Sequence, residues 1–253
     1  MSRLASASCS LVLLLMSAGC AHTPSEKEKR SAEIHYDLAL QAQQHGHMQD
    51  ALQELQKSLE NDPDYPEAHN AMGILLHLAF RRPDEAVKHY EHALKVRPTF
   101  SEARTNLANV HLDQGRYDEA IKLYELVLND MLYPTPYIAQ SNLGWALYKK
   151  GETERALQSL KASVTTNPGF CLGYRNLGII YDETGRLDDA CRQFTRFREN
   201  CANVAEAYMR EGVCQAKLGQ VDAAKQAFES CEAKAKPAEH ALKDDCRRLL
   251  EKL

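Results

Sequence analysis

Small residues recur along this chain at a nearly constant period, and that spacing restricts the possible folds more than any other feature. Two series of glycine and alanine repeat at intervals of 34 to 36 residues. The first series is Ala39, Gly73, Ala108, Gly144, Gly178 and Gly212, and the second is Ala51, Ala86, Ala120, Ala156, Ala190 and Ala224. A constant period of this length is typical of a solenoid, in which each repeat packs only on its neighbours.

The residue types predict that each repeat is a pair of antiparallel helices crossing closely at the small residues. Large side chains follow each alanine of the second series by four residues, on the same helical face: Leu55, Tyr90, Tyr124, Leu160, Phe194 and Phe228. Others precede the small residue of the first helix: Leu38, Met72, Leu107, Leu143 and Leu177. A turn glycine, which supplies the positive φ that ends a helix, separates the two helices in five repeats: Gly46, Gly115, Gly151, Gly185 and Gly219. The second repeat has instead one extra residue and Pro83, which predicts the start of its second helix.

These patterns resemble the tetratricopeptide repeat family over roughly residues 31–236. The run Asn-Leu-Gly-Trp-Ala-Leu-Tyr-Lys-Lys-Gly from Asn142 to Gly151 is close to the family's first helix. The resemblance implies an all-α, right-handed superhelical solenoid of six repeats over 31–237. Residues 238–253 are expected to form a capping helix that covers the last repeat. Such a fold predicts a binding scaffold.

The N-terminus reads as a targeting segment. Arg3 precedes a short apolar run from Leu11 to Met16, which is far below the roughly 20 apolar residues that span a bilayer but suits a secretory signal. The following Ser-Ala-Gly-Cys resembles the lipobox of bacterial lipoproteins. That resemblance implies a signal peptide over 1–19, diacylation (palmitate) at Cys20 and a flexible lipidated tether over 20–30. Because Ala21 rather than aspartate follows the cysteine, it also implies an outer-membrane anchor. An ordinary cleaved signal with a chance cysteine is the alternative.

Six further cysteines lie in the last third of the chain: Cys171, Cys191, Cys201, Cys214, Cys231 and Cys246. An even number in an exported protein indicates disulfide bonds. Antiparallel packing places the start of one helix beside the end of the next. It therefore indicates the pairs Cys171–Cys201 and Cys191–Cys214, which leaves Cys231 with Cys246. Zinc is the competing interpretation, but no Cys-x-x-Cys spacing supports it.

The sequence gives no support to catalysis, to a cofactor or to a metal site. It contains no phosphate-binding loop, nucleophile elbow or dinucleotide fingerprint. We expect His45 and His47, at a helix-ending turn, and His89 and His92, on one helix, to be solvated surface residues. The formal net charge of -4 comes without a dense basic stripe, which argues against nucleic acid as a partner. No small-molecule substrate is indicated.

Protein binding is the remaining function, since first helices line the concave groove in the family that the chain resembles. The side chains expected there are Tyr36, Leu40, Ile74, Leu78, Asn109, Leu112, Ile138, Trp145, Tyr148, Arg175, Ile179, Met209 and Val213. Exposed apolar and aromatic groups in a row mark binding surfaces. For Trp145, burial between helices is the alternative.

Three asparagines, Asn106, Asn142 and Asn176, share one helical position and resemble those of repeats that clamp a C-terminal carboxylate. The lysines of such a clamp are missing, so an amphipathic or extended apolar segment is the expected ligand.

A lipoprotein of this length that consists of six such repeats resembles the pilotins of type IVa pili, the PilF/PilW/Tgl group. The cysteine-rich last repeats look most like Tgl, the gliding-motility member. The resemblance implies that the protein binds secretin subunits and promotes their assembly in the outer membrane, facing the periplasm, for pilus biogenesis and motility. Two alternatives remain: an outer-membrane scaffold for peptidoglycan-modifying enzymes, and an inner-membrane or secretion-system adaptor.

Overall fold

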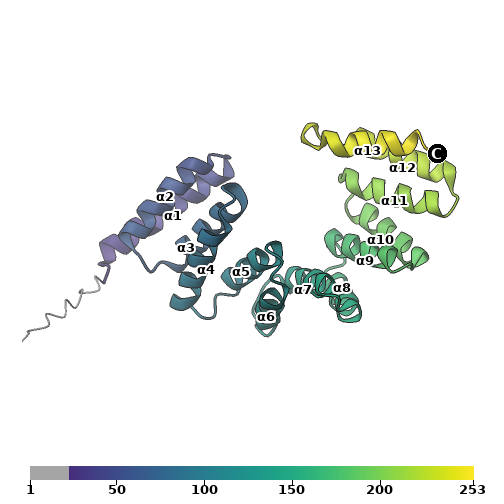
Figure 1. The fold of residues 1–253 in the computed structure, drawn as a ribbon. Coiled ribbons are helices and arrows are strands. Elements are labelled where there is room, and N and C mark those ends of the chain that lie inside the picture. Colours follow the sequence, from purple (N-terminus) through teal and green to yellow (C-terminus); the bar gives the residue numbers. More distant parts are fainter. Residues whose placement is uncertain (1–22) are drawn as a thin grey trace, which may run out of the picture.

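The computed structural model describes residues 23–253, which fold into an all-α solenoid of six helical hairpins and a final helix (Figure 1). Cys20 and the expected signal segment 1–19 lie outside the described residues. The first helices of the hairpins are α1 (Glu26–Gln44), α3 (Pro66–Ile74), α5 (Ser101–Asp113), α7 (Pro136–Lys150), α9 (Cys171–Glu183) and α11 (Ala205–Lys217). The second helices are α2 (Met48–Asn61), α4 (Pro83–Val96), α6 (Tyr117–Leu128), α8 (Thr153–Thr166), α10 (Leu187–Asn200) and α12 (Val221–Lys234). Helix α13 (His240–Leu250) follows a 3₁₀ turn, Pro237–Glu239, and packs on α12 as the expected cap.

The solenoid begins earlier than the sequence predicts. Helix α1 starts at Glu26, so the expectation of a flexible tether over 20–30 is wrong for residues 26–30. The reason is a capping box: the Ser25 side chain accepts a hydrogen bond from the Glu28 backbone, and the Glu28 carboxylate accepts one from the Ser25 backbone. This pair satisfies two of the backbone donors that have no partner within the helix at its start.

The two helices of each repeat meet where the sequence places its small residues. A Cβ atom at Gly178 would lie 2.4 Å from the ring of Phe194, and one at Gly73 would lie 2.6 Å from the ring of Tyr90. Phe194 and Tyr90 are themselves buried. Glycine is therefore required at these positions for the two helices to pack so closely, because protein cores leave no room for another methyl group.

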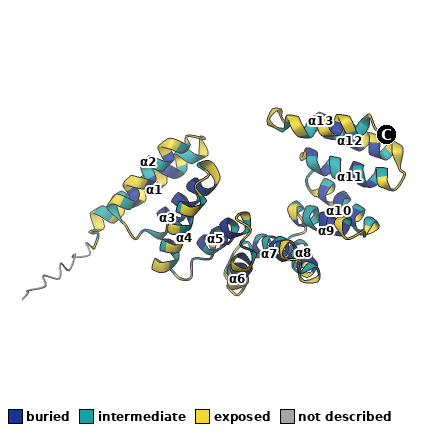
Figure 2. Cartoon of the chain, in the orientation of Figure 1, coloured by how far each residue is buried: buried dark blue, intermediate teal, exposed yellow. Residues whose placement is uncertain are grey.

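The large apolar residues that precede the small ones are buried in repeats two to five but not in the first repeat. Met72, Leu107, Leu143 and Leu177 lie in the core, whereas Leu38 is 42% exposed. In later repeats this side chain packs on the preceding hairpin, and α1 has no preceding hairpin among the described residues (Figure 2).

The turns between paired helices follow the prediction in five repeats and take a different solution in the second. All five predicted turn glycines adopt positive φ. In repeat two, Arg81 takes the left-handed conformation instead, with φ of 56°. The extra residue is absorbed by a π-helical segment, η1 (Leu75–Ala79), that continues α3. Pro83 then occupies the first turn of α4, as predicted.

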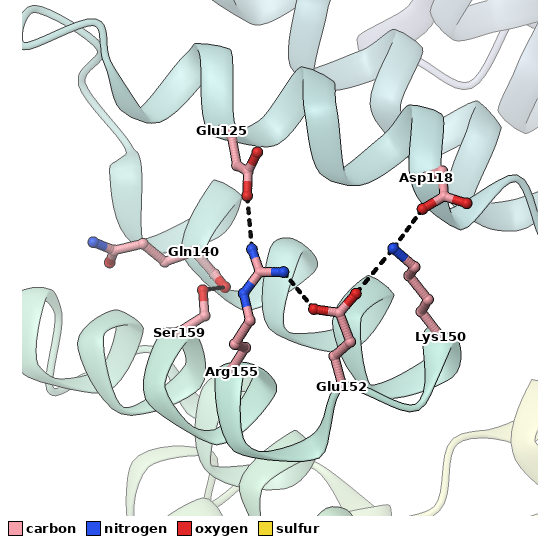
Figure 3. A network of polar contacts seen from close by, with 7 residues as sticks. All are labelled: Asp118, Glu125, Gln140, Lys150, Glu152, Arg155 and Ser159. Atoms are coloured by element: carbon pink, nitrogen blue, oxygen red, sulfur yellow. Dashed lines mark hydrogen bonds and ion pairs between the residues drawn. The ribbon is translucent and has the colours of Figure 1, made fainter.

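Charged side chains bridge the third and fourth repeats on the surface. Lys150 contacts Asp118 at 2.6 Å and Glu152 at 2.9 Å (Figure 3). Arg155 continues the network to Glu152 and, at 2.9 Å, to Glu125 on α6. Exposed pairs contribute little stability one by one. This network therefore orients α6 against α7 and α8 more than it stabilises them.

Three disulfide bonds lie in the last two repeats and the cap. They join Cys171 to Cys201, Cys191 to Cys214, and Cys231 to Cys246, which are the pairs indicated by antiparallel packing. The first is within repeat five, the second joins repeats five and six, and the third fixes α13 to α12. Each such bond contributes about 2–4 kcal/mol in typical proteins. The C-terminal part of the solenoid is consequently cross-linked, whereas the described N-terminal part holds no disulfide.

Histidines form a cluster in repeat two, and the expectation of a solvated residue does not hold for His89, which is half-buried. The buried His69 accepts at Nδ1 a hydrogen bond of 2.9 Å from His89 Nδ1, while its Nε2 donates to the Pro63 carbonyl at 2.9 Å. The ring of His92 stacks on His69, and its Nε2 contacts Asp64 at 2.8 Å. Burial, together with the neighbouring His69 and His92, lowers the pKa of His89 to about 4. Burial also lowers the pKa of His69.

We expect Gly178→Ala to destabilise the solenoid. Overpacking against Phe194 costs about 1–3 kcal/mol, which the roughly 1 kcal/mol better helix propensity of alanine only partly offsets. Urea denaturation followed by circular dichroism measures the change. Gly169→Ala is the matched control, because a Cβ there lies 3.4 Å from its nearest neighbour. A Gly178→Ala protein as stable as the wild type would contradict the close-approach model.

The histidine cluster predicts that repeat two loses stability in acid. Because the folded-state pKa values of His69 and His89 lie below the ordinary value of 6.5, the unfolded chain binds more protons below that pH. Stability is fully present above about pH 6.5 and falls as the pH drops toward 4, by at most about 1.4 kcal/mol per pH unit for one group.

This prediction is measured as the urea midpoint at several pH values for the wild type, His89→Gln and the exposed control His45→Gln. Glutamine keeps a donor toward His69 but does not titrate, so the His89 variant should show the flatter profile. Equal slopes for all three proteins would exclude the cluster as the cause.

Candidate partner-binding groove

Side chains from three successive first helices line one mainly apolar hollow of about 450 Å³. It is bordered by Ile74, His77, Leu78, Tyr90, Asn106, Asn109, Leu112, Asp113 and Asn142. Four of these, Ile74, Leu78, Asn109 and Leu112, belong to the groove predicted from the sequence. The hollow therefore lies where first helices were expected to receive a partner.

The π-helical segment helps to form this hollow. Its extra residue lets His77 reach across to Asp113 on α5 at 2.9 Å, while Leu78 beside it remains 59% exposed. Segments of this kind are frequent at functional sites, because they redirect side chains out of the regular helical row.

Asparagine amides connect the first helices along the floor of the groove. Asn106 donates to Asn70 at 3.0 Å, and Asn142 donates to Asn109 at 2.9 Å. The hydroxyl of Tyr124 also donates to Asn109, at 2.6 Å. Asn176 makes a longer contact of 3.5 Å to Ser141. These amides join neighbouring repeats, which gives Asn106 and Asn142 a structural use other than clamping a carboxylate.

Trp145 lies half-buried on α7, with one side against the core. Its ring centroid is 5.7 Å from that of Tyr148, and the Lys149 ammonium lies 4.8 Å from the indole centroid. The hydroxyl of Tyr148 donates to Glu183 on the next first helix, and this contact raises the pKa of Tyr148 to about 12. Trp145 and Tyr148 thus form a partly exposed aromatic pair.

The predicted groove residues of the C-terminal repeats are less available to a partner. Ile179 is only 8% exposed and belongs to the core, so the expectation that it lines an open groove does not fit its burial. The Arg175 guanidinium is bonded to Glu206 of the next repeat at 2.9 Å. Met209 packs against the cluster around the Cys231–Cys246 bond, and Val213 is half-buried.

The remaining predicted positions are Tyr36, Leu40 and Ile138, all half-buried. The ring of Tyr36 lies 5.4 Å from that of Tyr65, in an edge-to-face arrangement. Burial, with Glu67, Asp37 and Glu102 nearby, raises the pKa of Tyr36. The first groove position is therefore surrounded by negative charge.

Sequence reasoning missed two kinds of residue. One is the set of polar groups on the groove floor, such as the buried Asn70, which helical spacing alone does not separate from solvated residues. The other is the pair Met131 and Leu132, which are 97% and 90% exposed in the loop between α6 and α7. The 36-residue spacing across this loop is the signal that could have drawn attention to it.

Over residues 23–253, no group of three or more histidine, cysteine or acidic side chains is arranged to hold a metal ion. In the same range no helix combines the length and apolar character that crossing a bilayer requires.

Comparison with known proteins agrees with the repeat pattern. Residues 77–131 and 175–239 match family models described as tetratricopeptide repeat. The chain therefore contains tetratricopeptide repeats, folded as an all-α solenoid.

Similar solved structures include that of PilW, a widely conserved type IV pilus biogenesis factor. It is 24% identical, with a TM-score of 0.73, over 80% of this chain and 92% of that one. PilF of Pseudomonas aeruginosa is 18% identical, also with a TM-score of 0.73, over 88% of this chain and 99% of that one. Likeness at this level of identity establishes the fold.

Curated relatives include the protein FlbA of Caulobacter vibrioides, 24% identical over 81% of this chain. A probable peptide N-acetylglucosaminyltransferase, SPINDLY of Hordeum vulgare, is 30% identical over 56% of it. The matched part of this chain spans 34% of the length of FlbA and 15% of the length of SPINDLY.

Proposed function

We propose that this protein is a non-catalytic, lipid-anchored scaffold that binds secretin subunits and promotes their assembly in the outer membrane for type IV pilus biogenesis. The observation that carries the proposal is the apolar groove across α3, α5 and α7, on a solenoid similar to PilW over 80% and to PilF over 88% of this chain. The cysteine-rich last repeats favour a Tgl-like, gliding-motility member of that group.

The anchor gives this scaffold a physical advantage. A diacylated Cys20 would hold the solenoid at the membrane where the client must assemble, because two acyl chains anchor stably where one is marginal. Confinement at the surface raises the effective concentration of the scaffold around an aggregation-prone subunit. The groove would cover apolar surface of the subunit until assembly buries it.

Deletion of the gene, followed by gel analysis of heat-resistant secretin multimers, tests the function. We expect the multimers to disappear while monomers accumulate, and full-length protein to restore them. Cys20→Ser protein should be folded but mislocalised, and it should restore assembly poorly. Normal multimers with altered cell-wall morphology would instead favour a scaffold for peptidoglycan-modifying enzymes.

Trp145→Ala separates binding from folding in the groove. We expect this variant to lose about tenfold or more in affinity for secretin subunits, since aromatic anchors dominate many interfaces. Its melting temperature should fall by only a few degrees, because the indole is half-buried. Calorimetric titration and thermal melting measure the two effects. A large loss of thermal stability with unchanged affinity would assign Trp145 to the core.

A further inference from the structure

The loop between α6 and α7 presents two large apolar side chains to solvent from a well-anchored backbone. Met131 and Leu132 are almost fully exposed, whereas Tyr133, the next residue, is buried. The Asp130 carboxylate accepts hydrogen bonds from the Leu132 backbone at 3.0 Å and from Ser101 on α5 at 2.6 Å. A loop held in this way displays Met131 and Leu132 at low cost in conformational entropy on binding, which is a property of docking surfaces.

Beside this loop lies a second hollow, of about 340 Å³, which we call the acidic-apolar subsite. It is lined by Tyr36, Glu67, Asn70, Arg97, Phe100, Ser101, Glu102, Asp130, Leu132, Tyr133 and Pro134. Asn70 lines this subsite, and its hydrogen-bond partner Asn106 lines the hollow across α3, α5 and α7. The two hollows are therefore neighbouring parts of one groove.

Negative charge distinguishes the subsite from the rest of the groove. Glu67 uses one carboxylate oxygen to pair with Arg97 at 2.7 Å, while its other oxygen is buried and finds no hydrogen-bond partner among the described residues. Glu102 is exposed on the subsite wall and is not part of any ion pair described for this structure. A buried carboxylate oxygen without a donor is costly, and a cationic donor from a partner would satisfy it.

The aromatic ring of Tyr36 completes a site for a cation. A lysine or arginine side chain can lie over a tyrosine face while its head group reaches nearby carboxylates. Three carboxylates, Glu67, Glu102 and Asp130, line the subsite together with one cation, Arg97. A carboxylate ligand or an anionic lipid surface would therefore meet net negative charge and be repelled. The charge thus selects a basic protein segment over both of these occupants.

We propose that the acidic-apolar subsite docks a protein segment in which a lysine or arginine is flanked by large aliphatic residues. The cation pairs with Glu67 and Glu102 beside Tyr36, and the aliphatic residues pack on Met131 and Leu132. The inference deepens the proposed function and rests on it, since the segment would belong to the client that the groove receives.

The probe for this proposal is a fluorescent, C-terminally amidated peptide, Gly-Leu-Lys-Leu-Ser-Leu-Lys-Leu-Gly, titrated with full-length protein in neutral detergent. Two companion peptides carry glutamate or serine in place of both lysines. The lysine peptide should bind about tenfold or more tightly than the glutamate peptide, and added salt should reduce the difference.

Matched variants locate the binding. Glu102→Lys and Leu132→Ser should each lower the affinity for the lysine peptide by about tenfold. Glu102→Lys should also raise the affinity for the glutamate peptide. The controls are Glu119→Lys and Leu126→Ser, which alter an exposed carboxylate and an exposed leucine on α6, outside the subsite. These should bind like the wild type, and circular dichroism verifies that all four variants fold.

Equal affinity for the three peptides, or unchanged affinity in Glu102→Lys and Leu132→Ser, overturns the inference. If the protein promotes secretin assembly but does not prefer the lysine peptide, the inference alone fails. If it prefers the lysine peptide through Glu102 and Leu132 while gene deletion leaves secretin multimers intact, the subsite is supported and the proposed client is wrong.

Discussion

The contact between a small residue on each first helix and a large side chain on the second sets the geometry of the whole solenoid. At Gly178 and Phe194 the helices are so close that a single methyl group would not fit. This distance fixes the crossing of the two helices, and the crossing fixes how the next hairpin packs. Four repeats make this contact at a glycine, and repeats one and three place the buried Ala39 and Ala108 at the same position. Because the small residue recurs in every repeat, the hairpins add with a regular rotation and leave first helices side by side along a groove.

The groove is best developed where the repeats depart from regularity. In repeat two, one extra residue converts the end of α3 into the π-helical segment and leaves Leu78 exposed beside the hollow. Across repeats three and four, the longer spacing yields the loop that displays Met131 and Leu132. In repeat two the extra residue is accommodated inside the helix, since Leu75, Leu76 and His77 of the π-helical segment stay buried. Only the end of the segment, at Leu78, reaches the surface, where it produces a feature that a partner can recognise.

The contrast between regular contacts and irregular segments also explains which features could be predicted from the sequence. The period, the turn glycines and the close-packed pairs depend on residue types that few alternatives can replace, so the solenoid and its helix order follow from them. Ile179 was assigned to the groove and His89 to a solvated helix surface because helical spacing gives only an approximate direction. Ile179 is instead part of the core, and His89 is half-buried because it contacts the buried His69 of α3. The unpartnered oxygen of Glu67 has no sequence signal at all.

The three disulfides lie in repeats five and six and the cap, whereas the groove across α3, α5 and α7 lies in repeats two to four, and this separation has a consequence for stability. Repeats five and six are cross-linked, and the Arg175–Glu206 pair further joins them, so this end has little freedom to adjust to a partner. Repeats one to four depend on packing, amide pairs and exposed ion pairs, which permit local opening at lower free energy. A client segment bound across α3, α5 and α7 would contact several repeats at once and stabilise them by mass action. The bound client would in this way supply to the N-terminal repeats the connection between hairpins that disulfides supply to the C-terminal ones.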